Sequence, residues 1–266
     1  MNTEFDPEHG QSAYPVRFDW GPTGAEATIG PAGAAYAVVV DVLSFTTTVT
    51  VAVEQGIEVF PHPWRDARAK ELAMRLGATL AVGRFEALAL EGRHVSLSPA
   101  SLLQSHDITR LVLPSPNGST ISFGLADSGC TVLAASLRNR RAVAAHLATR
   151  LWAPSAVGHA PSLTVIAGGE RWPDDSLRPC AEDLWGAGAV LAALVDLGVE
   201  GLSPEARVAE QAFRAVEPEL VGEVAACAGG RELAAKGFAD DVEVASQLDV
   251  SDVVPVLTDG CFASVD

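Results

Sequence analysis

Apolar runs and amphipathic segments alternate along most of this 266-residue chain. A continuous run of β-branched residues is typical of a strand buried on both faces of a sheet, whereas apolar positions three and four apart are typical of a helix packed on one side. The pattern predicts strands at 14–20, 35–43, 57–61, 79–83, 110–113, 131–135, 162–167 and 253–257. It predicts helices at 46–55, 64–76, 121–127, 139–151, 181–197, 205–216, 218–227 and 229–236, and a short one from 241.

This order of elements predicts one fold class. Because strands and helices alternate from end to end, we expect a three-layer α/β/α fold around a mixed, largely parallel sheet. The stretch from Gly21 to Gly33 is rich in Gly, Pro and Ala, and we expect a loop or a short edge strand there. No repeat or linker divides the chain, so we expect a flexible N-terminal tail over 1–12 and a single domain over 13–266.

Composition and charge argue against some classes of binding partner. The chain has 18 Lys and Arg against 34 Asp and Glu, a net charge of −16. Such a field opposes nucleic acid and anionic membranes, so an anionic ligand needs a local arrangement or a cation to hold it. The four cysteines form no CxxC pair, and the chain has neither a secretory leader pattern nor a membrane-spanning apolar run. We therefore expect a cytoplasmic protein without nucleic-acid or membrane partners.

Polar side chains follow the strand that ends at Asp41. In open α/β sheets, ligands bind outside the carboxyl ends of the strands. Asp41 comes after four apolar residues, and Ser44 and Thr46–Thr48 follow it. A carboxylate without a partner is costly to bury, so Asp41 needs a cation, hydrogen-bond donors or the mouth of a pocket. A structural alternative has Ser44 capping the next helix while Asp41 accepts backbone N–H groups.

Two further turns carry polar side chains. Ser115-Pro116-Asn117-Gly118-Ser119-Thr120 can line an anion-binding nest of backbone N–H groups, or can be an ordinary turn with a helix cap. The third turn runs from Gly168-Gly169-Glu170-Arg171 to Cys180-Ala181-Glu182-Asp183. Its carboxylates suit a hard cation, although acidic residues also favour a helix N-terminus through the dipole.

The predicted helix after Asp183 contains Gly186 and Gly188. A glycine inside a helix costs about 1 kcal/mol relative to alanine. We therefore expect either a packed backbone or a ligand to approach this helix closely.

In this order and spacing, the motifs resemble the 2-phosphosulfolactate phosphatase family from about residue 14 to the end of the chain. The motifs are Val39–Thr47, Ser115–Ser119, Ala167–Glu170, Glu182-Asp183, Gly186–Gly188, Gly237-Phe238, Asp240-Asp241, Leu248-Asp249 and Val253–Leu257. The resemblance implies a three-layer α/β fold. It also implies magnesium-dependent hydrolysis of a phosphate ester on a short sulfonated hydroxy acid, a step towards coenzyme M biosynthesis.

Candidate site residues follow from the turns and the resemblance together. Candidate catalytic residues are Asp41, Glu170 and Arg171, and candidate Mg²⁺ ligands are Asp41, Glu182 and Asp183. Candidate substrate-binding residues are Ser44, Thr46, Thr47, Arg84, Ser98, Asn117, Gly118 and Ser119. We expect a small phosphorylated acid as substrate, attacked by water or by a side chain, and a homodimer is one open option.

Ser44 departs from the family's pattern, which commonly has Arg after Asp-Val-Leu. The change removes a fixed cation that would bind phosphate or sulfonate, and Arg84 or Arg171 could replace it. The family's middle loop often has Asn-Ser-Pro, where this chain has Leu97-Ser98-Pro99. The alternative function is therefore that of a catalytically weak relative, which binds a small phosphorylated or carboxylated metabolite.

Overall fold

The computed structural model describes residues 5–30, 34–63, 66–89, 94–151 and 161–265. The strands of its main sheet are β1 (Val16–Trp20), β2 (Tyr36–Val40), β3 (Glu58–His62), β4 (Thr79–Leu80), β5 (Arg110–Pro114), β6 (Thr131–Ala135), β7 (Leu163–Ala167), β10 (Pro255–Thr258) and β11 (Cys261–Ser264). A separate hairpin pairs β8 (Glu170–Arg171) with β9 (Leu177–Arg178).

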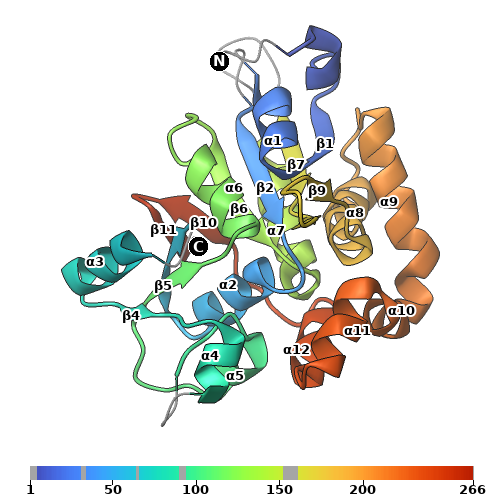
Figure 1. Cartoon of the computed structure of the whole chain (residues 1–266). Helices are drawn as coiled ribbons and strands as arrows, with labels where there is room; N and C mark the ends of the chain where they lie inside the picture. The colour runs from blue at the N-terminus through green and yellow to red at the C-terminus, as the bar shows by residue number, and fades with distance from the viewer. Residues whose placement is uncertain (1–4, 31–33, 64–65, 90–93, 152–160, 266) are drawn as a thin grey trace.

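The helices lie between these strands in the chain and on both sides of the main sheet (Figure 1). They are α1 (Gly21–Ile29), α2 (Phe45–Glu54), α3 (Ala67–Leu76), α4 (Arg84–Ala89), α5 (Pro99–Leu103), α6 (Gly118–Leu125), α7 (Arg140–Leu151), α8 (Ala181–Asp196), α9 (Pro204–Val216), α10 (Leu220–Ala226), α11 (Ala228–Ala235) and α12 (Ala239–Ser246). None of the described helices combines the length and apolar character needed to cross a bilayer.

The strand order of the main sheet is β1-β7-β2-β6-β10-β11-β3-β5-β4. Two parallel groups, β1-β7-β2-β6 and β3-β5-β4, flank the antiparallel hairpin of β10 and β11. Since β6–β10, β10–β11 and β11–β3 all pair antiparallel, the second group runs opposite to the first. The prediction of a mixed, largely parallel sheet is confirmed, and strand β11 was not predicted.

Strand β2 shows why the fold has three layers. Its alternate side chains point to opposite faces. Val38 and Val40 join an apolar cluster covered by α7, α8 and α9, whereas Ala37 and Val39 join a second cluster covered by α1, α2 and α6. Burial on both faces therefore explains the uninterrupted apolar run that precedes Asp41.

The glycines of α8 have a packing explanation. A Cβ added at Gly188 would stand 2.0 Å from the carbonyl oxygen of Ala209 on α9, and one at Gly186 would stand 2.5 Å from a methyl group of Val42. Of the two alternatives, packed protein rather than a ligand approaches this helix. The close packing places the first turn of α8 against the end of β2.

The stretch predicted as a loop or edge strand over 21–33 is instead helix α1, with residues 31–33 outside the described part. Gly21 makes the turn into the helix at φ +61°, with a proline in the first helical turn. A Cβ at Gly24 would stand 2.6 Å from the carboxylate of Asp19. The small residues therefore reflect tight helix packing, which composition alone does not distinguish from a loop.

Two other segments differ from the prediction. In the tail expected over 1–12, Pro7–Gly10 form a 3-10 helix, and the buried Gln11 side chain donates to the Phe18 carbonyl at 2.7 Å. Residues 1–4 of that tail lie outside the described part, as do residues 64–65 of the helix predicted from 64. No helix is predicted between residues 84 and 109, where the structure has the short helices α4 and α5.

Candidate functional site

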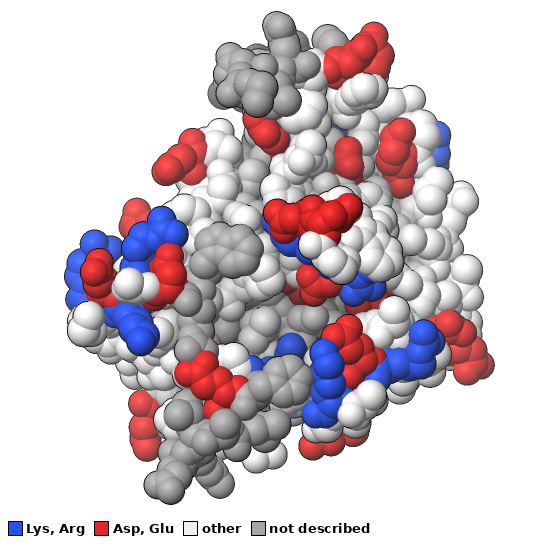
Figure 2. Space-filling model, in the orientation of Figure 1, with Lys and Arg blue, Asp and Glu red and all other residues white. Residues whose placement is uncertain are grey.

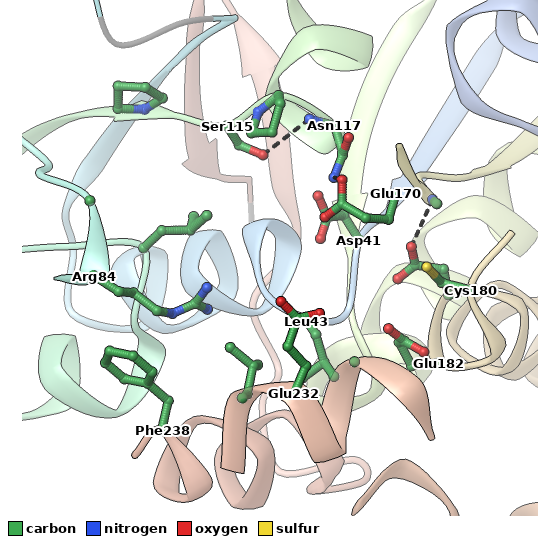
Figure 3. A pocket seen from close by; sticks show the side chains of 18 of the residues that line it. Asp41, Leu43, Arg84, Ser115, Asn117, Glu170, Cys180, Glu182, Glu232 and Phe238 are labelled. Carbon is green, nitrogen blue, oxygen red and sulfur yellow. Dashed lines mark hydrogen bonds between the residues drawn. The ribbon is translucent and has the colours of Figure 1, made fainter. Parts of the chain in front are cut away.

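A cavity of about 440 Å³ opens where the carboxyl ends of β2, β5 and β7 meet (Figure 3). The three polar turns meet there: the backbone N–H of Gly118 donates to Asp41 Oδ2 at 2.9 Å, and Asn117 Nδ2 donates to Glu170 Oε1 at 3.1 Å. The charged side chains on the cavity wall are Asp41, Arg84, Glu170, Arg178, Glu182, Asp183, Glu232 and Lys236. On the face drawn in Figure 2, basic side chains lie beside acidic ones.

Asp41 lies beneath the cavity and is almost fully buried. Besides Gly118, its carboxylate accepts the backbone N–H of Phe45 at 3.2 Å, at the start of α2. Burial and, to a smaller extent, the charge of Glu170 raise the pKa of Asp41, the two N–H donors and Arg84 lower it, and the net result is a pKa of about 6. Asp41 therefore combines the two roles that the sequence leaves open: it accepts backbone N–H groups and it lines the cavity.

Glu182 and Asp183 come from the first turn of α8 and are buried beside Asp41. The Asp183 carboxylate accepts the backbone N–H of Val42 at 2.7 Å and that of Gly169 at 2.8 Å. Burial, then the charges of Asp41 and Glu182, raise the pKa of Asp183 well above its ordinary value. The structure thus gathers carboxylates whose charges repel one another.

The N-terminus of α6 reaches the cavity through a close approach to Asp41. A Cβ at Gly118 would stand 2.5 Å from the Phe45 ring and 2.9 Å from the Asp41 carboxylate. Glycine is therefore required for this contact. The preceding Asn117 makes no side-chain cap and instead orients Glu170.

Three predicted substrate-binding hydroxyls are not brought to the cavity. Thr46 Oγ1 donates to the Asp41 carbonyl at 2.8 Å, Thr47 Oγ1 donates to the Val42 carbonyl at 2.8 Å, and Ser119 Oγ donates to the His62 carbonyl at 2.9 Å. All three side chains are fully buried. A strand-to-helix turn leaves backbone groups without ladder partners, and these hydroxyls satisfy them.

The other two predicted serines are also absent from the cavity wall: Ser44 bonds Arg84 directly, and Ser98 is linked to Arg84 through Asp241. Ser44 Oγ accepts a hydrogen bond from Arg84 Nη2 and does not cap α2. Ser98 Oγ donates to Asp241 Oδ1 at 2.6 Å, and Arg84 Nε donates to Asp241 Oδ2 at 3.1 Å. Asp241 is a site residue that sequence reasoning missed; its only signal was the Asp240-Asp241 pair near the end of the chain.

Arg171 was predicted as catalytic, but it does not line the cavity. Successive side chains of a strand point to opposite sides, so Glu170 faces the cavity while Arg171 turns away and bonds Asp175 at 3.0 Å. The cavity receives Arg178 instead, which pairs with Glu170 across the β8–β9 hairpin and lies 5.6 Å from the centre of the Trp172 ring. The structure therefore places Arg178, and not Arg171, on the cavity wall.

Cys180 lines the cavity but is poorly suited to act as a nucleophile. Burial, followed by the charges of Asp183 and Glu182, raises the pKa of its thiol far above the ordinary value. The thiolate, which is the nucleophilic form, is thereby suppressed.

The carboxylates of the cavity wall are candidate ligands for a Mg²⁺ ion that keeps most of its waters. Among the described residues, no group of three or more Asp, Glu, His or Cys side chains is arranged as a ready-made metal cage. Mg²⁺, however, usually keeps several waters and takes only one or two protein carboxylates together with substrate phosphate. Asp41, Glu182 and Asp183 lie on one side of the cavity, the charges of the first two raise the proton affinity of Asp183, and one or two of these carboxylates would be enough for that mode of binding.

The residues that match known proteins include all those that line this cavity. The sequence profile of the 2-phosphosulpholactate phosphatase family matches residues 26–260. A probable 2-phosphosulfolactate phosphatase of Carboxydothermus hydrogenoformans is 31% identical over 218 residues, which are 82% of this chain and 84% of the relative. A second, from Deinococcus radiodurans, is 28% identical over 226 residues, 84% of this chain and 88% of the relative. The chain therefore belongs to the 2-phosphosulfolactate phosphatase family.

Proposed function

We propose that this protein hydrolyses the phosphate monoester of a small hydroxy acid, with 2-phosphosulfolactate as the reference substrate. The observation that carries the proposal is the polarity of the cavity. Figure 3 shows Asp41, Glu170 and Glu182 on one side and Arg84 on the other. A substrate with a phosphate at one end and a second acidic group at the other matches this arrangement. Family membership and the names of the relatives support phosphatase activity.

We place the phosphate on the carboxylate side. Asp41, with Asp183 or Glu182, would hold Mg²⁺ there; when bound, the ion would neutralise phosphate charge and polarise the phosphorus–oxygen bonds. The N-terminus of α6, beside Asp41, adds the positive end of a helix dipole.

Glu170 is suited to accept a proton from an attacking water. Its carboxylate is half-buried on the cavity wall and is oriented by Asn117 Nδ2 and by the backbone N–H of Arg171 at 2.8 Å. Water would attack phosphorus, the ester phosphorus–oxygen bond would break, and the leaving alkoxide oxygen would take up the proton removed from the water to become the hydroxyl of the product. The products would be inorganic phosphate and the free hydroxy acid.

Arg84 would receive the second acidic group. Its guanidinium donates to Ser44, the position where the family's pattern commonly has Arg. The missing cation, which motivated the alternative of a binding-only relative, is thus supplied from α4, and the catalytic proposal is favoured.

Phosphate release tests this proposal. Purified protein should release phosphate from 2-phosphosulfolactate in the presence of MgCl₂, lose the activity in EDTA and regain it when Mg²⁺ is restored. The variant Asp183→Asn should be inactive, while Asp127→Asn, which changes an exposed carboxylate outside the cavity, should behave as the wild type. Binding of the substrate without any turnover would establish the binding-only alternative, and turnover that ignores EDTA would refute the role of the metal.

A further inference from the structure

We infer that Asp241 is a positioning residue that fixes the guanidinium of Arg84, and that this fixed guanidinium selects substrates carrying a second acidic group. The inference rests on the proposed function and assigns the part of the substrate that Arg84 recognises. Asp241 lies 157 positions from Arg84 along the chain and belongs to α12, outside all three polar turns.

Both oxygens of the Asp241 carboxylate accept hydrogen bonds from groups of the protein. Oδ2 accepts from Arg84 Nε at 3.1 Å, and Oδ1 accepts from Ser98 Oγ at 2.6 Å and from the backbone N–H of Ala100 at 3.1 Å. Only 1% of the Asp241 side chain is exposed, and 14% of that of Arg84. A buried carboxylate with every contact satisfied holds a charged partner in one geometry. Asp241 thereby connects α12, the start of α5 and the start of α4.

Arg84 is restrained from two further directions. Its Nη2 donates to Ser44, in the turn that follows Asp41, and its guanidinium carbon lies 5.7 Å from the centre of the Phe238 ring. Since Nε and Nη2 are the atoms already engaged, Nη1 remains without a hydrogen-bond partner among the described residues. Figure 3 shows the guanidinium end of Arg84 directed into the cavity, across from Asp41 and Glu182.

This arrangement creates selectivity. The Nη1 group of Arg84 has N–H donors that no described residue accepts, and it can give a charge-assisted hydrogen bond to a carboxylate or sulfonate. A long side chain ordinarily loses rotamer freedom when it binds a ligand, but Arg84 has already lost it in the folded protein. The phosphate end meets a different set of residues, so Arg84 should discriminate by the second acidic group and not by the phosphate.

The test compares two substrates: 2-phosphosulfolactate, which has further acidic groups, and p-nitrophenyl phosphate, which has none. Asp241→Asn and Arg84→Met should each raise the KM for 2-phosphosulfolactate at least about tenfold, because a charge-assisted contact is lost or misplaced. The kcat/KM for p-nitrophenyl phosphate should fall by a much smaller factor, since that substrate never uses the contact and Arg84 affects it only through its charge near Asp41. Arg84→Lys should restore only part of the selectivity.

Asp240→Asn is the matched control, because Asp240 is the exposed neighbour of Asp241 in the same helical turn. It should leave both substrates unaffected. If Asp241→Asn does not fold, Ser98→Ala removes one contact of Asp241 and should raise the KM for 2-phosphosulfolactate to a smaller extent. Equal losses on both substrates, or no change on either, would overturn the inference.

A binding measurement separates this inference from the proposed function. Sulfoacetate carries two acidic groups and no phosphate, and calorimetry should show it binding the wild type more tightly than Arg84→Met. If the wild type hydrolyses neither phosphate ester, the proposed function fails. The affinities of sulfoacetate for the wild type and Arg84→Met still test whether Arg84 binds an acidic group. Equal affinity of sulfoacetate for the two proteins would reject the role of Arg84.

Discussion

The carboxylate of Asp41 accepts hydrogen bonds from two backbone N–H groups and lies beneath the cavity. Burial is the largest cause of its raised pKa, about 6 against an ordinary 3.8. Because folding raises this pKa, the folded metal-free protein binds the proton more tightly than the unfolded chain. The stability linked to Asp41 is therefore full below the unfolded pKa and is lost as the pH rises through about 6, by about 3 kcal/mol.

Asp41→Asn should abolish this pH dependence and reduce kcat at least about a hundredfold. The amide cannot accept from both N–H groups, so the variant should be less stable than the wild type at about pH 4, by roughly 1–3 kcal/mol. Towards about pH 8 the difference should move in favour of the variant by about 3 kcal/mol, to near-equal or higher stability. Urea unfolding in EDTA between about pH 4 and pH 8 measures the free energy of unfolding of the wild type and the variant, with Asp127→Asn as the control. If the stability difference between the two proteins does not change with pH, the ionised carboxylate of Asp41 does not destabilise the folded state.

At the scale of elements, α6 is placed by the approach of Gly118 to Asp41 and Phe45. Gly118→Ala puts a methyl group 2.5 Å from the Phe45 ring, so the start of the helix must move. We expect a loss of about 1–3 kcal/mol in the free energy of unfolding, together with a loss of phosphatase activity.

Gly124→Ala is the matched change on the same helix, since a Cβ there meets nothing within 4 Å. Alanine is the better helix former, so this variant should keep its activity and gain about 0.5–1 kcal/mol. Calorimetry and phosphate release on both variants test the pair. Similar stability in the two would mean that α6 tolerates displacement.

At the scale of the whole molecule, an acidic protein must bind an acidic substrate. The net charge is −16, and Asp41, Glu182 and Asp183 add buried acidic groups at the cavity. Mg²⁺ bound among these carboxylates would relieve their repulsion and stabilise the folded state by mass action. The ion competes with protons, so the stabilisation should be larger at about pH 8 than at about pH 5.

Thermal unfolding tests this expectation without any substrate. MgCl₂ should raise Tm by roughly 2–4 °C for each kcal/mol of stabilisation, and KCl of equal ionic strength should raise it less, because KCl only screens charge. The gain should disappear in Asp183→Asn. Equal effects of the two salts on the wild type would argue against a magnesium site.

Local sequence patterns determined the elements of the sheet and the position of its key carboxylate. The β-branched run of β2, the polar break at Asp41 and the end of a helix at residue 76 each depend on residues close together in the chain, and each is found where it was predicted. The carboxyl ends of β2 and β7 lie at one edge of the sheet because these strands pair in parallel. Strand β5 belongs to the group that runs opposite, so its turn reaches Asp41 through tertiary packing. The homodimer stays a prediction, to be measured by sedimentation.

Tertiary packing decided which polar side chains face the cavity. Thr46 and Thr47 resembled ligand-binding hydroxyls in the sequence, but the turn uses them for its own backbone. Arg178 faces the cavity and Arg171 does not, because successive side chains of a strand alternate. The sequence pattern did not predict the hairpin to which they belong. The contact of Arg84 with Asp241 joins residues 157 positions apart. A local pattern reports only the backbone that nearby residues prefer, whereas the partner of a buried charge is chosen by the packing of distant elements.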